Sequence, residues 1–224
     1  MFIGHFAVGL MAKRFAPRAS LPVLLAAPQV LDILWPVFVA AGVERARIVP
    51  GITEASPLAL DYMPWSHSLA MTVVWSALFA GAYLVVTLDR RGAAVLAACV
   101  MSHRGLDAAS HRPDVPLGFG EARVGLGLWN SLPLTLVVET AMFAFGAWTY
   151  AAATRPRTRA GSFLWWGLVA FLLVGYVIAA FSRPPPGIGP VIASALGVIV
   201  LTLGWAYAIE RRRENVPTPQ TNPA

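Results

Sequence analysis

Three side chains that can bind metal ions recur at intervals of four residues in the stretch SHRGLDAASHRPD: His103, Asp107 and His111. Four residues of an α-helix advance about 6 Å and drift only about 40° around its axis, so the three would share one helical face. Imidazole and carboxylate groups together suit zinc or manganese, with Asp107 as the bridging ligand. The spacing predicts a site for one or two divalent ions. A simpler alternative is that these side chains extend from a helix end toward the membrane interface.

The other two histidines can reach the same level of the molecule. The chain has four histidines, and none follows residue 111. His67 comes directly after the segment Pro-Trp-Ser, where proline and serine favour a helix start. His5 reaches that level only if residues 1–15, which would rise about 22 Å, form a short helix inserted into the membrane. We expect this inserted form, with Lys13 at the cytoplasmic surface and the amino terminus outside.

Two acidic residues, Asp32 and Glu139, lie in the middle of apolar runs. An ionised side chain at the centre of a bilayer costs about 2.5–3.5 kcal/mol, so each needs a partner. For Asp32 the alternatives are an ion pair with Arg104, a protonated carboxyl group hydrogen-bonded between helices, and metal ligation. The most economical partner of Glu139 is Arg104. The last two apolar runs hold no histidine or aspartate, and this segregation favours a metal site built by the earlier helices.

The composition places these residues in a polytopic membrane protein. Of 224 residues, 57% are hydrophobic and only 12% are charged, where soluble domains have about 25%, and the mean hydropathy is +0.64. Apolar runs of about 20 residues can cross a hydrocarbon core of about 30 Å. We therefore expect an all-α membrane helix bundle with about six long spans and the short amino-terminal helix. The spans cover roughly residues 20–43, 65–88, 92–109, 130–153, 162–181 and 188–209.

The polar residues divide the chain into three parts. Residues 1–153 hold every candidate ligand and are expected to form the metal-site bundle. Residues 154–210 are expected to supply two scaffold transmembrane helices. Residues 211–224 are polar and contain prolines, which predicts a cytoplasmic tail that is disordered beyond its first few residues.

The excess of basic residues is explained by membrane topology. The formal net charge is +6, from 17 Lys and Arg against 11 Asp and Glu. The basic residues lie in loops without interleaved aromatic residues, so we expect the lipid bilayer, and no nucleic acid, as the partner. Eleven of them fall on one predicted side, which should be cytoplasmic and should also hold the carboxyl terminus. These are Lys13, Arg14, Arg18, Arg90, Arg91, Arg155, Arg157, Arg159, Arg211, Arg212 and Arg213.

The ordered set of polar residues resembles a known family. It comprises a His-x-x-x-Gly from His5, the acidic Asp32, a His-Ser pair at His67, and the His-x-x-x-Asp from His103 to Asp107. In this order the residues resemble the YdjM-like family of bacterial membrane-bound, metal-dependent hydrolases, over about the first 150 positions. The resemblance implies a multi-pass protein of the bacterial cytoplasmic membrane with hydrolase activity. It departs from the family in having one carboxylate where Pro-Asp-x-Asp usually has two, so the number of ions stays open.

The chemistry these residues support is metal-assisted hydrolysis. Ions held by imidazole and carboxylate lower the pKa of a bound water from about 16 to about 7, and the hydroxide attacks an ester or phosphoester. Asp32 or Asp114 would be the general base, or would orient a ligating histidine. Arg112 and Arg123, in the same outer loop, are candidates to hold a phosphate, or are ordinary interface charges. A site at the membrane surface favours an amphiphilic or lipid-linked substrate.

Two other classes of function compete with a hydrolase. Asp32, Arg104, Asp107 and Glu139 are the kinds of intramembrane groups that a transporter or proton pathway needs. Such a pathway requires access for water from both faces of the membrane. Alternatively, a closed site of four ligands would be purely structural and would only connect helices.

Overall fold

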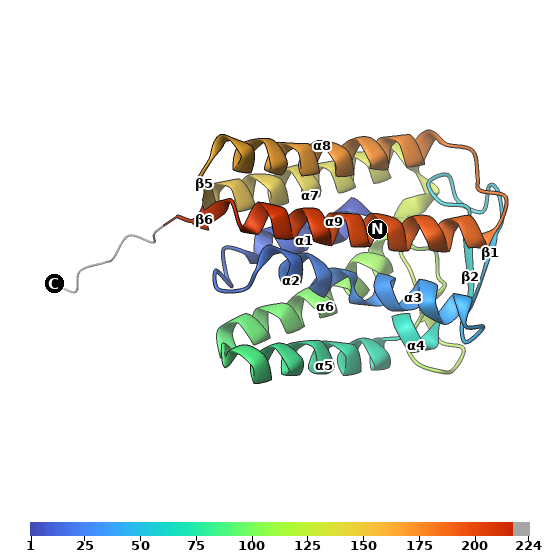
Figure 1. The fold of residues 1–224 in the computed structure, drawn as a ribbon. Coiled ribbons are helices and arrows are strands. Elements are labelled where there is room, and N and C mark those ends of the chain that lie inside the picture. The colour runs from blue at the N-terminus through green and yellow to red at the C-terminus, as the bar shows by residue number, and fades with distance from the viewer. Residues whose placement is uncertain (217–224) are drawn as a thin grey trace.

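The protein is a bundle of helices that run side by side (Figure 1), as the sequence predicts. The computed structural model describes residues 1–216. Within them, five helical segments are long and apolar enough to cross a membrane. These are the broken helix Leu21–Ala40, α5 (Leu69–Thr87), α7 (Leu132–Ala153), α8 (Arg159–Phe181) and α9 (Ile188–Glu210).

The one remaining predicted span, residues 92–109, corresponds to α6 (Arg90–Ser110). This helix has the length of a span but a more polar composition. Its buried face includes His103, Arg104 and Asp107. These polar residues lower its mean hydropathy, which is why it is missing from the five apolar segments. In Figure 1 it lies between α5 and α1, so neighbouring helices cover much of its surface. An interior helix of this kind can carry charged groups because they do not meet lipid.

The opening residues form the short helix that the sequence predicts, α1 (Ile3–Ala12), and it packs inside the bundle. Its most extensive packing is on α7, where a Cβ on Gly146 would come within 2.7 Å of the Ala7 carbonyl oxygen. Met1 is only 7% exposed and lies inside the bundle. The outer position of the amino terminus stays a prediction.

The first two predicted spans are both broken near the site. The first comprises α2 (Leu21–Ala26), a 3-10 turn η1 (Ala27–Gln29) and α3 (Val30–Ala40). The interruption falls at Pro28, which lacks an N–H and cannot continue the helical hydrogen bonds. The second comprises α4 (Pro64–His67) and α5, separated by the extended residue Ser68, whose side chain caps α5 by accepting from Met71 N.

Short antiparallel strand pairs close the two ends of the bundle. β1 (Arg45–Ile48) pairs with β2 (Leu58–Tyr62), with Arg45 opposite Tyr62 and Ile48 opposite Leu58. In that hairpin, two hydrogen bonds from the Arg47 guanidinium lower the pKa of the Asp61 carboxyl group. The loop after α6 holds β3 (Val115–Pro116), β4 (Arg123–Val124) and the turn η2 (Leu128–Asn130).

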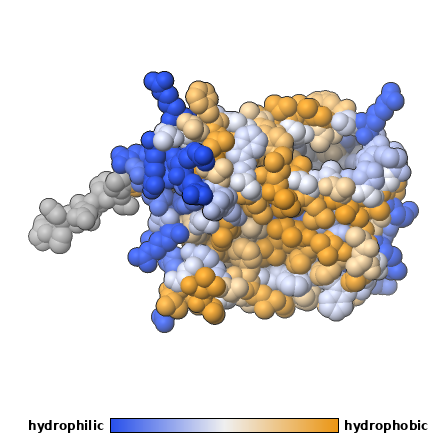
Figure 2. Space-filling view, in the orientation of Figure 1, coloured by the Kyte–Doolittle hydropathy of each residue, from blue (hydrophilic) through white to orange (hydrophobic). Residues whose placement is uncertain are grey.

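The opposite end carries β5 (Thr154–Pro156) paired with β6 (Arg213–Asn215). The expected tail therefore begins as an ordered strand, and the prediction of disorder falls on residues 217–224, outside the described residues. The α1–α2 and α5–α6 turns lie at this same end of the bundle in Figure 1. The segments that hold the eleven basic residues are therefore all at this end. Figure 2 shows hydrophilic residues at both ends and an apolar band between them, the pattern of a membrane-embedded protein.

Candidate metal centre

Asp107 lies at the centre of a cluster of imidazole rings. From the same helix, His103 Nε2 lies 3.0 Å from its Oδ2. His111 was expected to lie on the same helix, but α6 ends at Ser110. His111 follows it as the capping residue, in an extended conformation. Its Nε2 is nevertheless 3.6 Å from Asp107 Oδ1. The row of three converges as expected, although its last member is held by a loop and by stacking on Trp129 at 4.1 Å between ring centroids.

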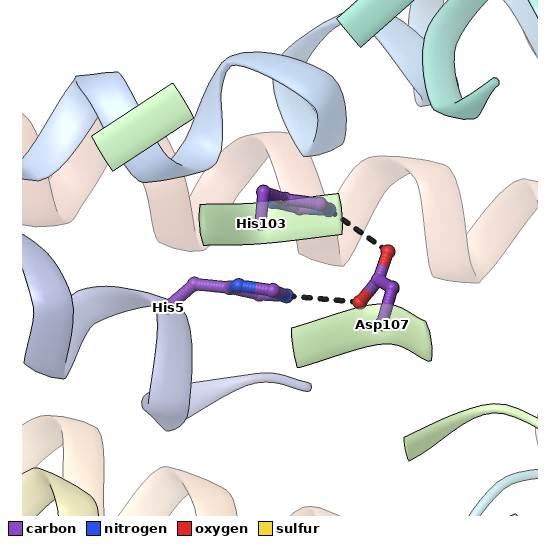
Figure 3. Close-up of side chains that lie close together, drawn as sticks. All are labelled: His5, His103 and Asp107. Atoms are coloured by element: carbon purple, nitrogen blue, oxygen red, sulfur yellow. Dashed lines mark hydrogen bonds and ion pairs between the residues drawn. The ribbon is translucent and has the colours of Figure 1, made fainter. Parts of the chain in front are cut away.

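Residues from three other helices join this cluster. His5 of α1 places Nε2 3.2 Å from Asp107 Oδ1, and its ring stacks on that of His103 with 3.8 Å between centroids (Figure 3). His67 Nε2 lies 3.6 Å from Asp107 Oδ2 and 3.6 Å from Asp32 Oδ1. The six predicted ligands therefore meet in one place, although they come from α1, α3, α4 and the end of α6.

The Nδ1 atoms of three histidines are bound to other groups, which leaves their Nε2 atoms to face the carboxylates. His103 Nδ1 lies 2.6 Å from the Pro28 carbonyl oxygen, and His111 Nδ1 lies 3.2 Å from Asp114 Oδ1. A carbonyl and a carboxylate only accept hydrogen bonds, so in both rings Nδ1 carries the hydrogen. Nε2 then faces the carboxylates, and in a neutral ring it would present a lone pair to a metal ion. Metal-ligating histidines are commonly oriented in this way by a carbonyl or carboxylate on the other nitrogen.

His67 is oriented through a buried chain of hydrogen bonds that includes Glu44. The ring Nδ1 lies 2.7 Å from Ser66 Oγ, and this hydroxyl donates to Glu44 Oε2 at 2.6 Å. The backbone N–H of Ser66 donates to the other carboxylate oxygen at 2.8 Å. Because the hydroxyl hydrogen is used by Glu44, Ser66 Oγ accepts from His67 Nδ1. The Nε2 atom then faces His103 Nε2 at 3.3 Å and the two carboxylates. Glu44 is 1% exposed and was not predicted, since nothing in its loop sequence marks it as a buried residue.

Changing Glu44 to glutamine should weaken metal binding without removing a ligand. The amide keeps the size of the side chain but cannot accept from both Ser66 groups, so the His67 ring loses its fixed orientation. We expect divalent metal affinity to fall about 10–100-fold, as for other partners of ligating histidines. The measurement is competition with a fluorescent zinc chelator. Glu54→Gln is the matched control, because Glu54 is exposed and accepts only from the Leu132 backbone N–H. Equal affinities of the two variants would contradict the role of Glu44.

The predicted ion pair of Glu139 with Arg104 is not formed, and neither is the alternative pair of Asp32 with Arg104. Glu139 was expected to pair with Arg104, but its Oε2 accepts from the backbone N–H groups of Phe2 and Gly4, at 2.8 and 3.2 Å. It thereby satisfies donors at the amino end of α1, where a negative charge is favourable. The Arg104 guanidinium instead donates to the Pro116 carbonyl oxygen at 3.3 Å, and Asp32 faces histidines rather than Arg104. Glu139 thus positions His5 by fixing the start of its helix.

The residues of the loop after α6 contact one another more than they face the site. Asp114 binds His111 through Oδ1 and Arg112 Nε through Oδ2, so of its two expected roles it fits that of orienting a histidine. Arg123 donates to the carbonyl oxygens of Leu60, Asp61 and Asp114, which connects two loops. Neither arginine lines the cavity described below. Their contact with a phosphate stays a prediction.

The donor atoms have the spacing that a bound ion requires. Two groups, His5–His103–Asp107 and Asp32–His67–His103, each bring their ligand atoms within 4.8 Å of one another. Two tetrahedral ligands about 2.0–2.1 Å from zinc lie about 3.3 Å apart, close to the separations found here. Asp107 directs Oδ1 toward His5, His111 and the amino group of Met1, which lies 3.1 Å away, and it directs Oδ2 toward His67 and His103. This arrangement suits a carboxylate that bridges two ions.

A cavity of about 490 Å³ reaches this cluster. Asp32, His67, Asp107 and His111 line its polar end, and the side chain of Asp32 is 33% exposed, where those of the other three are nearly buried. The remaining wall is mainly apolar and comes largely from α8 and α9. These helices were predicted as scaffold only, yet they form one side of the cavity.

Comparison of this chain with protein-family models, with curated proteins and with solved structures found no match.

Proposed function

We propose that this protein is a membrane-embedded, metal-dependent hydrolase that cleaves an ester or phosphoester of an amphiphilic substrate. The observation that carries this proposal is the set of three imidazoles whose Nδ1 atoms are engaged elsewhere and whose Nε2 atoms are directed at Asp107. Zinc or manganese held there would acidify a water molecule and polarise the bond to be cleaved. The YdjM-like resemblance implies the same class of reaction.

The exposure of Asp32 supports catalysis over a purely structural metal. A structural site is closed by its ligands, whereas a catalytic site keeps an open position. Asp32 faces both the histidine cluster and the cavity, with a third of its side chain accessible. Its carboxylate can therefore accept a proton from an attacking water beside a bound substrate.

The position of Glu139 weighs against a transporter or proton pathway. Such a pathway needs ionisable groups that are free to exchange protons or ions. Glu139 instead accepts from the backbone N–H groups of Phe2 and Gly4. One of the four groups that the pathway would use is thus engaged in holding the backbone.

The proposal is tested by metal analysis and a substrate screen on the purified protein. We expect zinc or manganese at one or two ions per chain. We also expect hydrolysis of lipid phosphoesters or esters that stops when a chelator removes the metal and returns when the metal is restored. Absence of metal from a folded preparation that also fails to take up added zinc or manganese would refute the proposal.

We also propose that the protein lies in a bacterial cytoplasmic membrane with its carboxyl terminus inside the cell. The positive-inside rule assigns the end with eleven basic residues to the cytoplasm. A fluorescent protein that folds only in the cytoplasm should be bright when fused after Ala224, and alkaline phosphatase at the same position should be inactive. The reverse pair of results would place the metal centre toward the cytoplasm.

A further inference from the structure

The cavity beside the metal centre combines a polar end with a long apolar wall. The wall includes Phe171, Leu172 and Ala179 of α8, and Val191, Ala195 and Ile199 of α9. Neither helix contributes a charged side chain to the lining. The groups that suit a polar head, by contrast, come from α3, α4 and α6. One end of the cavity is therefore polar, and the rest of its wall is mainly apolar.

The open side of this cavity lies within the apolar band. Gly175 and Ala179 of α8 and Ser194 of α9 line the cavity and are also exposed on the surface. Figure 2 shows the surface hollowed near these helices, toward the end that carries β1 and β2. A mouth bordered by small side chains between these two helices is expected to face lipid, because both helices are long and apolar enough to cross a membrane.

We infer that the cavity binds one hydrocarbon chain of a bilayer lipid, which enters between α8 and α9 and places the lipid's polar group at Asp32 and His67. This inference rests on the proposed function and names its substrate class as a membrane lipid. The volume of about 490 Å³ is within the range of roughly 300–1,000 Å³ for ligand pockets. A water-soluble ester would leave the apolar wall without a partner.

Gly175 offers a direct way to fill the cavity. A Cβ on this residue would have no heavy atom within 4 Å, so a larger side chain fits without displacing the backbone. Gly175→Leu should therefore fold and occupy the space of the hydrocarbon chain. Gly197→Leu on α9 is the matched control, because its Cβ also meets nothing within 4 Å and Gly197 does not line the cavity.

The test is photo-crosslinking in vesicles that contain phosphatidylethanolamine with a diazirine at the end of one acyl chain. Mass spectrometry locates the labelled residues. In the wild type and in Gly197→Leu, we expect labels on cavity residues of α8 and α9. In Gly175→Leu these labels should fall at least five-fold, while labels on outward-facing residues and the metal content stay unchanged. Ala195→Leu, a second cavity-filling variant, should behave as Gly175→Leu does.

The outcomes separate this inference from the proposed function. Equal labelling of the cavity in Gly175→Leu, Ala195→Leu and Gly197→Leu would overturn the inference, even if metal and hydrolysis are found. Labelling that falls in the two cavity variants alone would support a lipid site, even if the protein holds no metal and hydrolyses nothing.

Discussion

Replacing His103 and Asp107 together with alanine is expected to leave the purified protein without bound metal. The two residues supply the nitrogen and the carboxylate that approach most closely, at 3.0 Å, and both possible groups of ligands lose a member. The three remaining histidines would no longer have a carboxylate between them. We expect metal content below a tenth of the wild-type value by inductively coupled plasma mass spectrometry.

The control for this double variant is Asp61→Asn, which removes a carboxylate of the β1–β2 hairpin that pairs with Arg47. It should retain wild-type metal content. Both proteins must elute as folded species in size-exclusion chromatography. If the folded double variant keeps the wild-type stoichiometry, the ions are bound elsewhere in the protein.

Changing Asp32 to asparagine is expected to reduce hydrolysis by about 10²–10⁴-fold, the usual contribution of a positioned general base. The amide has the same size and can still contact His67, but it cannot take a proton from water. The measurement is the initial rate on whichever lipid ester or phosphoester the wild type cleaves. Metal content should be determined in parallel, because Asp32 also faces one of the two ligand groups.

Asp114→Asn provides the comparison for Asp32. Asp114 is bound to His111 and Arg112 and does not line the cavity, so its loss should act on metal affinity more than on the rate at saturating metal. Asp32→Asn should lower the rate even at saturating metal. A wild-type rate for Asp32→Asn under those conditions would exclude it as the base.

Local spacing and composition were sufficient to predict the residues that carry the candidate chemistry. The four-residue interval from His103 to Asp107 is read directly from helix geometry, and the apolar runs identify the long helices. The inserted form of α1 also follows, because only that arrangement brings His5 to the other histidines. These features depend on residues close together in sequence or on the thickness of the bilayer.

The supporting contacts were not predictable, because they join residues that are distant in sequence. Glu44 reaches Ser66 across 22 positions and Glu139 reaches Phe2 across 137. The ion pair expected between Glu139 and Arg104 was wrong, because charge matching alone ignores the backbone donors at helix ends, which compete for the same carboxylate. The role of the Pro28 carbonyl depends on a break in the helix that proline permits but does not require.

The packing of α1 against α7 has a consequence for how the protein is made. The ribosome releases the segment with His5 first, yet the helix that covers it and supplies Glu139 emerges about 130 residues later. A helix of ten residues is too short to stay across a bilayer by itself. Its packing against α7 and the hydrogen bonds from Phe2 and Gly4 to Glu139 can form only once α7 has been synthesised. The position of His5 is therefore fixed at a late stage of synthesis, after the segments that carry the other candidate ligands have already emerged.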